Sequence, residues 1–114
     1  MISKTMYYFI LFLAIVFEVI GTLCLKPNII SSLLLQVIIV VFSYSCSFGL
    51  LYVILKHLPV GVVYATWAGL GIVSVALFGK FFYKENLDLA AWAGILLIIS
   101  GVMVLNLISK SSVE

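Results

Sequence analysis

Uncharged apolar stretches divide this chain into four parts of similar length. Between Thr5 and Leu25 the only charged residue is Glu18, and residues 27–55, 58–79 and 89–109 carry no lysine, arginine, aspartate or glutamate. Each stretch is long enough for a helix of about 20 residues to cross the hydrocarbon core of a bilayer. The pattern predicts helices over residues 5–25, 31–55, 59–81 and 88–108. The alternating segments of about ten residues that typify membrane barrels are not seen.

The predicted connections between these helices are short. They centre on residues 26–28, 56–59 and 84–86. Short connections make adjacent helices antiparallel, and they leave no room for a domain outside the membrane. We therefore expect an all-α integral membrane protein, with residues 1–114 forming one four-helix transmembrane domain.

Composition agrees with that class and excludes several others. Apolar residues make up 66% of the 114 residues and charged residues 9%, against about half and a quarter in soluble domains. So short a chain has too little interior to hide that much apolar surface. A soluble enzyme, a disordered tail and a nucleic-acid-binding module are therefore excluded. Two cysteines are too few for a secreted disulfide scaffold.

The six lysines are balanced across the predicted membrane. Alternating helices place three on each side, namely Lys4, Lys56 and Lys110 against Lys26, Lys80 and Lys84. Because the lysines are evenly distributed, the positive-inside rule does not predict which side of the protein faces the cytoplasm. Two interpretations stay open: a weakly fixed orientation, or dual topology, in which copies insert both ways and pair antiparallel.

Glu18 is the candidate for chemistry. It lies about 10 Å from the Lys26 end of its predicted helix, at 1.5 Å per residue. A charge at that depth costs a few kcal/mol, and such residues mostly mark ion or substrate paths. Burial favours the protonated form of a carboxyl, as a proton carrier requires. The structural alternative is a neutral glutamate that bonds a neighbouring helix.

Small and polar residues share the helix face of Glu18. They are Leu11, Ala14, Gly21 and Thr22, at steps of three or four residues. Ala14 and Gly21 leave space beside the carboxyl, although small residues also serve close helix packing in membranes.

Aromatic residues offer a second part of a cation site. Tyr44 and Trp67 are predicted to lie about 20 Å from the face that Glu18 approaches, so that within one subunit they miss Glu18 in depth. An antiparallel partner across a core of about 30 Å brings them level with it. A buried carboxylate near aromatic rings suits a hydrophobic cation.

Glycines mark two further positions. Gly69 and Gly71 interrupt the third predicted helix, and they favour a hinge or only close packing. Gly94 and Gly101 lie on one face of the fourth helix, where we expect contact between two copies.

Other kinds of chemistry lack their motifs. There is no glycine-rich phosphate loop, no His/Cys cluster and no serine–histidine pair, and the single histidine, His57, is expected to be a solvated loop residue. We expect no enzyme activity, no metal and no cofactor, with an ion gradient as the energy source.

Two dense motifs resemble the small multidrug resistance family. Residues 14–22, AIVFEVIGT, followed by Lys26, are similar to the first-helix signature, and residues 61–72, GVVYATWAGLGI, to the third-helix signature. Leu87-Asp88-Leu89 and the glycines of the fourth helix, through to Asn106, also match. The resemblance covers essentially the whole chain.

The resemblance implies an antiparallel, dual-topology homodimer in the bacterial inner membrane that exports lipophilic cations in exchange for protons. Glu18 would be the site shared by proton and substrate. Gly69 and Gly71 would form the hinge, and Gly94 and Gly101 the dimer contact. The resemblance further implies a substrate chamber, lined by Leu11, Ala14, Ile15, Gly21, Thr22, Tyr44, Ser47, Tyr64 and Trp67.

Other functions remain open within and outside this family. Guanidinium exporters typically carry tryptophan three residues after the glutamate, where this chain has Gly21, so the multidrug branch is favoured. A polyamine exporter, one half of a heteromeric pair, and a non-transporting membrane assembly protein are the alternatives.

Overall fold

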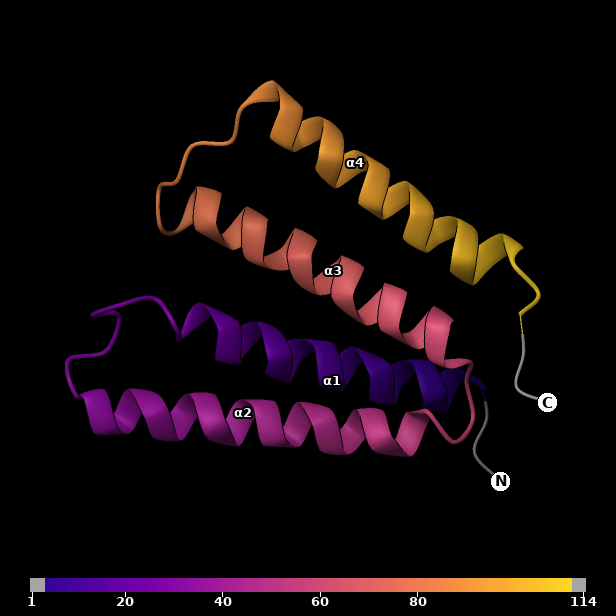
Figure 1. Cartoon of the computed structure of the whole chain (residues 1–114), viewed down its shortest axis with the longest axis horizontal. Coiled ribbons are helices and arrows are strands. Elements are labelled where there is room, and N and C mark those ends of the chain that lie inside the picture. The colour runs from indigo at the N-terminus through magenta and orange to yellow at the C-terminus, as the bar shows by residue number, and fades with distance from the viewer. Residues whose placement is uncertain (1–3, 112–114) are drawn as a thin grey trace. The chain divides into compact units, whose positions relative to one another are not determined.

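The structure is a computed structural model that describes residues 4–111 (Figure 1). α1 spans Lys4–Leu23, α2 Leu33–Ile54, α3 Val60–Phe81 and α4 Leu89–Met103, and α4 continues into a π-helical turn, η1, over Val104–Ile108. Four helical segments are long and apolar enough to cross a membrane: Thr5–Leu23, Leu33–Ile54, Val60–Phe81 and Leu89–Ile108. The prediction of four transmembrane helices, with no strand among the described residues, is confirmed.

The contacts within the chain group into two compact units, which divide between Leu58 and Pro59. The first unit holds α1 and α2, and the second holds α3, α4 and η1. Each unit is an antiparallel helical hairpin (Figure 1). A single domain over residues 1–114 stays a prediction, as does the antiparallel dimer.

The first connection is longer than the sequence pattern predicts. α1 ends at Leu23 and α2 begins at Leu33, each two residues inside the predicted bound. The late start of α2 has a local cause, since the Ser32 hydroxyl accepts a hydrogen bond from the Leu35 amide at 3.2 Å. Serine in this role satisfies a backbone N–H that the first helical turn leaves without a partner. Asn28, at φ 63°, adopts a left-handed conformation within this connection.

Gln36 ties the end of α1 to α2. Its side-chain nitrogen donates to the carbonyl oxygens of Cys24 at 2.7 Å and Lys26 at 3.0 Å. The Lys26 carbonyl also accepts from the Ile29 amide at 3.3 Å, and a carbonyl left unbonded in the membrane costs several kcal/mol. This buried side chain therefore closes the first hairpin at its connection.

The second hairpin is joined by a polar cap and a close helix contact. Asp88 caps α4 by accepting a hydrogen bond from the Ala91 amide at 2.9 Å.

α3 runs without a break through Gly69 and Gly71, and α4 packs against Gly69. A Cβ added at Gly69 would lie 2.7 Å from a methyl carbon of Val102, so only glycine allows this approach. In η1 the Ser109 amide donates to the Val104 carbonyl at 2.9 Å.

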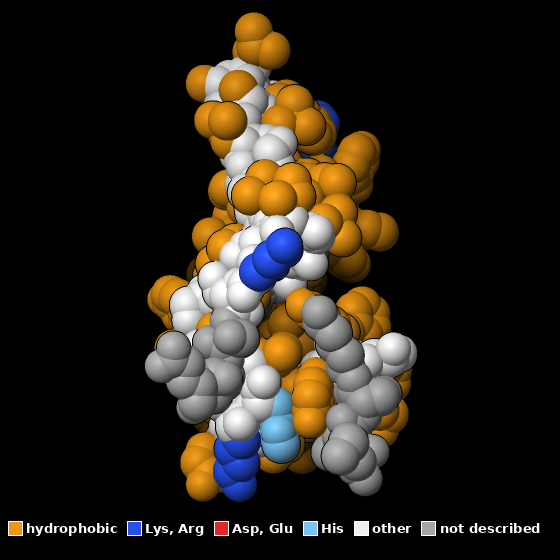
Figure 2. Space-filling view, turned by 90° about the vertical axis from the view of Figure 1, so that its right-hand side faces the viewer, with side chains coloured by type: hydrophobic (Ala, Val, Ile, Leu, Met, Phe, Trp, Pro, Cys, Tyr) orange, Lys and Arg blue, Asp and Glu red, His pale blue; other side chains and the backbone are white. Residues whose placement is uncertain are grey.

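Apolar side chains, orange, are prominent on the face shown in Figure 2. Each helix contributes large exposed side chains, for example Phe12, Phe42, Ile72 and Leu97. A soluble monomer rarely exposes so large an apolar surface, whereas lipid accommodates it. The fold thus presents its helices to the hydrocarbon core of a bilayer.

Candidate functional site

Glu18 lies in the C-terminal half of α1, with its carboxyl group held at one oxygen. The Thr22 hydroxyl, one helical turn later, donates to Glu18 Oε1 at 2.8 Å. Glu18 Oε2 is buried and has no hydrogen-bond partner among residues 4–111. A buried oxygen without a donor is costly, so this atom is suited to take up a proton or to face a cation.

Tyr44 extends this hydrogen bond into a chain across the first hairpin. Its phenol oxygen lies 2.7 Å from Thr22 Oγ1. A threonine hydroxyl has one hydrogen, and here it is directed at Glu18, so the phenol must donate to Thr22. The order Tyr44 to Thr22 to Glu18 directs both donors toward the carboxylate, and successive hydrogen bonds strengthen one another.

This geometry contradicts one prediction. Tyr44 was expected to miss Glu18 in depth within one subunit, yet it reaches the hydroxyl that binds Glu18. Tyr44 is only eleven residues after Leu33, about 16 Å along the axis, and its side chain leans toward the helix N-terminus, where the first connection lies. The depth of Tyr44 therefore gives no support to an antiparallel partner. For Trp67 the depth stays a prediction.

Gly21 allows the Tyr44 ring to approach α1. A Cβ at position 21 would lie 3.0 Å from Tyr44 Cε1 and 3.3 Å from Ser43 Cβ. The space expected beside the carboxyl at Gly21 is thus filled by an aromatic ring in this conformation. A tryptophan here, as in guanidinium exporters, could not coexist with Tyr44 in its present position.

The other predicted chamber residues of the first hairpin are buried. Ser47 Oγ donates to the Ala14 carbonyl at 2.7 Å, and both residues are 0% exposed. Leu11 and Ile15 are also buried. In this conformation these four residues offer no open surface, and their role in lining a chamber stays a prediction.

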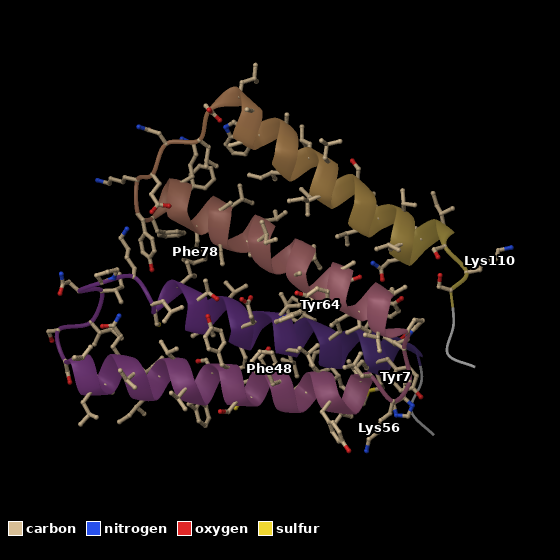
Figure 3. The ribbon with its side chains drawn as sticks, in the orientation of Figure 1. Tyr7, Phe48, Lys56, Tyr64, Phe78 and Lys110 are labelled. Atoms are coloured by element: carbon tan, nitrogen blue, oxygen red, sulfur yellow. The ribbon has the colours of Figure 1, made fainter. Side chains whose placement is uncertain are left out.

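In the second hairpin, Tyr64 and Trp67 form an aromatic pair on α3. Their ring centroids are 5.5 Å apart and their planes are tilted by 52°. Tyr64 is largely exposed (Figure 3). Aromatic rings are the groups that cation–π binding uses, and Tyr64 is the exposed member of this pair.

The four glycines predicted to form the hinge or the dimer contact have different surroundings. Gly69 serves close packing against α4, and Gly71 is buried in continuous helix, so their action as a hinge stays a prediction. A Cβ at Gly94 or Gly101 would meet nothing within 4 Å. The space beside these two is open, as a contact with a second copy requires.

Sequence reasoning overlooked the Thr66–Asn106 pair. Asn106 Nδ2 donates to Thr66 Oγ1 at 2.9 Å and to the Val102 carbonyl at 2.8 Å. The first bond joins η1 to α3, and the second joins it to the preceding turn of α4. Two polar residues in separate apolar stretches were the available signal, but the sequence did not show that they face each other.

His57 makes a contact that was not predicted. Its imidazole is exposed, as expected, but it stacks on the Tyr7 ring with centroids 4.5 Å apart and planes at 9°. The histidine, pale blue, is visible on the face shown in Figure 2, and it lies two residues before Pro59 in the chain. Among residues 4–111 no group of three His, Cys, Asp or Glu side chains could hold a metal ion.

These observations define a multi-pass membrane protein of two helical hairpins with one acidic residue in its spans. The family model for the Small Multidrug Resistance protein matches residues 6–98, and the chain belongs to this family. It is therefore a multi-pass protein of the bacterial inner membrane.

Several named proteins resemble the chain over most of its length. A multidrug transporter of Pseudomonas aeruginosa is 47% identical over 105 residues, covering 92% of this chain and 96% of the relative. The quaternary ammonium compound-resistance protein QacF of Klebsiella aerogenes is 47% identical over 95 residues, covering 83% and 86%. The multidrug transporter EmrE of Escherichia coli is 39% identical over 99 residues, covering 87% and 90%.

Proposed function

We propose that this chain exports lipophilic and quaternary ammonium cations from bacteria in exchange for protons, with Glu18 as the shared site. One observation carries the proposal. Glu18 is the only acidic residue in the four spans, and it is oriented through Oε1 while Oε2 has no partner among the described residues. Two relatives are named for resistance to quaternary ammonium compounds, which supports this choice of substrate.

The chemistry is a competition for one carboxylate. A proton on Oε2 neutralises Glu18 and removes its attraction for a cation. Loss of that proton restores a negative charge in a medium of low dielectric constant, where a lipophilic cation is strongly attracted. Thr22 keeps the carboxyl oriented in both states, and aromatic rings add cation–π attraction.

The proposed transporter is an antiparallel homodimer of copies inserted in opposite orientations. The even distribution of lysines and the open space at Gly94 and Gly101 support this arrangement. The two Glu18 carboxyls would then form one shared site. If the dimer changes its open side only when the pair is neutralised by protons or by substrate, proton entry drives cation exit.

Binding of tetraphenylphosphonium to the purified full-length protein, measured across pH, tests the shared site. We expect affinity to rise with pH in the wild type, because fewer protons then compete for Glu18. Glu18→Gln should abolish binding at every pH. Glu85→Gln is the matched control, since that carboxyl lies outside the spans, and it should bind like the wild type.

Transport is tested separately in proteoliposomes with an imposed pH gradient. Wild-type protein should accumulate a lipophilic cation against its gradient, whereas Glu18→Gln should not. Full pH-driven uptake by Glu18→Gln would falsify the proposal. Absence of binding in both proteins would favour a guanidinium or polyamine substrate, an obligate partner subunit, or a structural role for Glu18.

A further inference from the structure

A hydrogen-bonded pair in the second hairpin is separate from the Glu18 hydrogen-bond chain. Thr66 is buried on α3, and its hydroxyl oxygen accepts from Asn106 Nδ2 at 2.9 Å. Asn106 lies 40 residues later in the chain, in η1. Val63 and Gly69, three residues to either side of Thr66, are also buried and share its helix face. Thr66 is therefore a polar residue within an apolar contact face.

This pair stabilises the hairpin less than apolar residues could. Asn106 Nδ2 uses both of its hydrogens, one on Thr66 and one on the Val102 carbonyl. Turning the amide over would bring Oδ1 against that carbonyl oxygen, so Oδ1 stays buried with no hydrogen-bond partner among residues 4–111. A buried polar atom without a partner is destabilising, and apolar residues of similar shape at both positions would avoid that loss. Stability alone therefore does not explain the pair.

The pair fixes the rotation of α3 about its own axis. Gly69 packs against Ile98 and Val102, and apolar contacts of this kind are non-directional, so they allow one helix to turn against the other. A hydrogen bond requires its donor and acceptor to lie within a narrow range of angles. The bond between Thr66 and Asn106 thus selects one rotational setting of α3.

The aromatic pair of α3 lies on a different face of the same helix. At about 3.6 residues per turn, Trp67 lies about 100° and Tyr64 about 160° around the axis from Thr66. The two rings contact each other, with centroids 5.5 Å apart. Because Thr66 is held on one face, the direction in which both rings leave the other face is set as well.

We propose that Thr66 and Asn106 are positioning residues that turn the Tyr64 and Trp67 rings toward the transported cation. This inference rests on the proposed function, since it takes the two rings to be part of the cation site. Neither Thr66 nor Asn106 contacts the substrate. Cation–π attraction requires the cation to lie over the face of a ring, so a different rotation of α3 weakens the attraction although both rings are present.

The environment of the Trp67 ring tests the positioning role without any substrate. The chain has two tryptophans, so full-length Trp92→Phe protein labelled with 5-fluorotryptophan carries fluorine at position 67 alone. In fluorine NMR spectra we expect Thr66→Val and Asn106→Leu to move or broaden the signals. The double variant should resemble either single variant, because each breaks the same bond. Thr66→Ser keeps the hydroxyl and should preserve the spectrum.

Ser100→Ala is the matched control. The Ser100 hydroxyl donates to the Leu96 carbonyl within α4 at 2.8 Å, so its loss removes a hydroxyl from the same hairpin but leaves the bond between η1 and α3 intact. The fluorine spectrum should not change. SDS titration then compares stabilities. The Thr66→Val/Asn106→Leu double variant should unfold at the wild-type SDS concentration or above it, because donor and acceptor are removed together.

Binding of tetraphenylphosphonium shows whether the positioned rings act on a cation. We expect Thr66→Val to weaken binding about three- to tenfold, as the loss of one cation–π contact implies, whereas Thr66→Ser should bind like the wild type. In a Trp67→Leu background, Thr66→Val should have a much smaller further effect, because the larger of the two positioned rings is gone.

Two outcomes would overturn the proposal. An unchanged fluorine spectrum in both Thr66→Val and Asn106→Leu would show that the pair only holds the helices together. Equal weakening by Thr66→Val with and without the Trp67 ring would show that Thr66 acts through another group. Failure of the wild type to bind tetraphenylphosphonium would instead count against the proposed function, and the fluorine spectra would still decide whether the pair positions Trp67.

Discussion

The Tyr44 ring lies directly against Gly21, with Cε1 at 3.0 Å from the position that a Cβ would take. This contact lets the phenol reach Thr22 at 2.7 Å, and Thr22 in turn holds Glu18. A glycine at position 21 therefore sets the surroundings of the only acidic residue in the spans, although it has no side chain of its own.

Gly21→Ala should destabilise the protein by about 1 kcal/mol, because the added methyl group overpacks the contact with the Tyr44 ring. The free energy of unfolding is measured by SDS titration in detergent micelles. In a Tyr44→Leu background the same change should cost much less, since the rigid ring is gone. An equal cost in both backgrounds would show that the contact is unimportant.

Thr22→Val should lower the affinity for tetraphenylphosphonium roughly five- to tenfold, because Glu18 Oε1 loses its donor. Thr22→Ser keeps the hydroxyl and should bind almost normally. Tyr44→Phe should have a smaller effect, and none in the Thr22→Val background, since Tyr44 reaches Glu18 only through Thr22. Additive effects in the double variant would contradict this relay. Isothermal titration calorimetry at the pH of maximal wild-type binding provides these affinities.

Gln36→Met should lower the free energy of unfolding by about 1–3 kcal/mol. Methionine has a similar shape, but it cannot donate to the Cys24 and Lys26 carbonyls. Ser45→Ala serves as the control, because Ser45 is exposed on the same helix and should change stability little. If Gln36→Met is as stable as the wild type, the Ile29 amide, which also donates to the Lys26 carbonyl, and solvent at Cys24 must suffice without Gln36.

Gly69→Ala should cost about 1–3 kcal/mol of stability, since its methyl group would overlap the Val102 side chain. Val102→Ala in the same chain should restore much of that loss by making room. Thermal unfolding of the single and double variants in detergent measures the coupling. Failure of Val102→Ala to rescue would show that Gly69 is needed for backbone flexibility, which would favour the hinge.

Gly101→Leu should reduce the dimer fraction in detergent if α4 forms the contact between copies, because close approach needs a small residue. Gly49→Leu is the matched control, as Gly49 also has no neighbour within 4 Å of its Cβ position. Sedimentation velocity reports the oligomeric state. Equal dimer fractions in both variants would place the contact elsewhere.

Much of the fold could be predicted from the sequence, because helix number in a membrane follows from the length of uncharged stretches. A backbone in lipid must satisfy its own hydrogen bonds, so four such stretches imply four helices. The bounds were less predictable. The Ser32 cap fixes the start of α2, and Gln36 binds two carbonyls of the first connection. None of these bonds is visible in the apolar pattern.

Glu18 could be identified as the candidate site residue from the sequence alone. A single carboxyl in an apolar span is costly to bury, and such residues mostly mark ion or substrate paths. Its surroundings needed the tertiary structure. Spacing put Gly21 and Thr22 on its helix face, but only the pairing of α1 with α2 showed that Tyr44 fills the space at Gly21 and hydrogen-bonds Thr22. The cost of burying a carboxyl depends on the residue and on the apolar span around it, and both can be read from the sequence. Its hydrogen-bond partners depend on how two helices pack side by side, which only the tertiary structure decides.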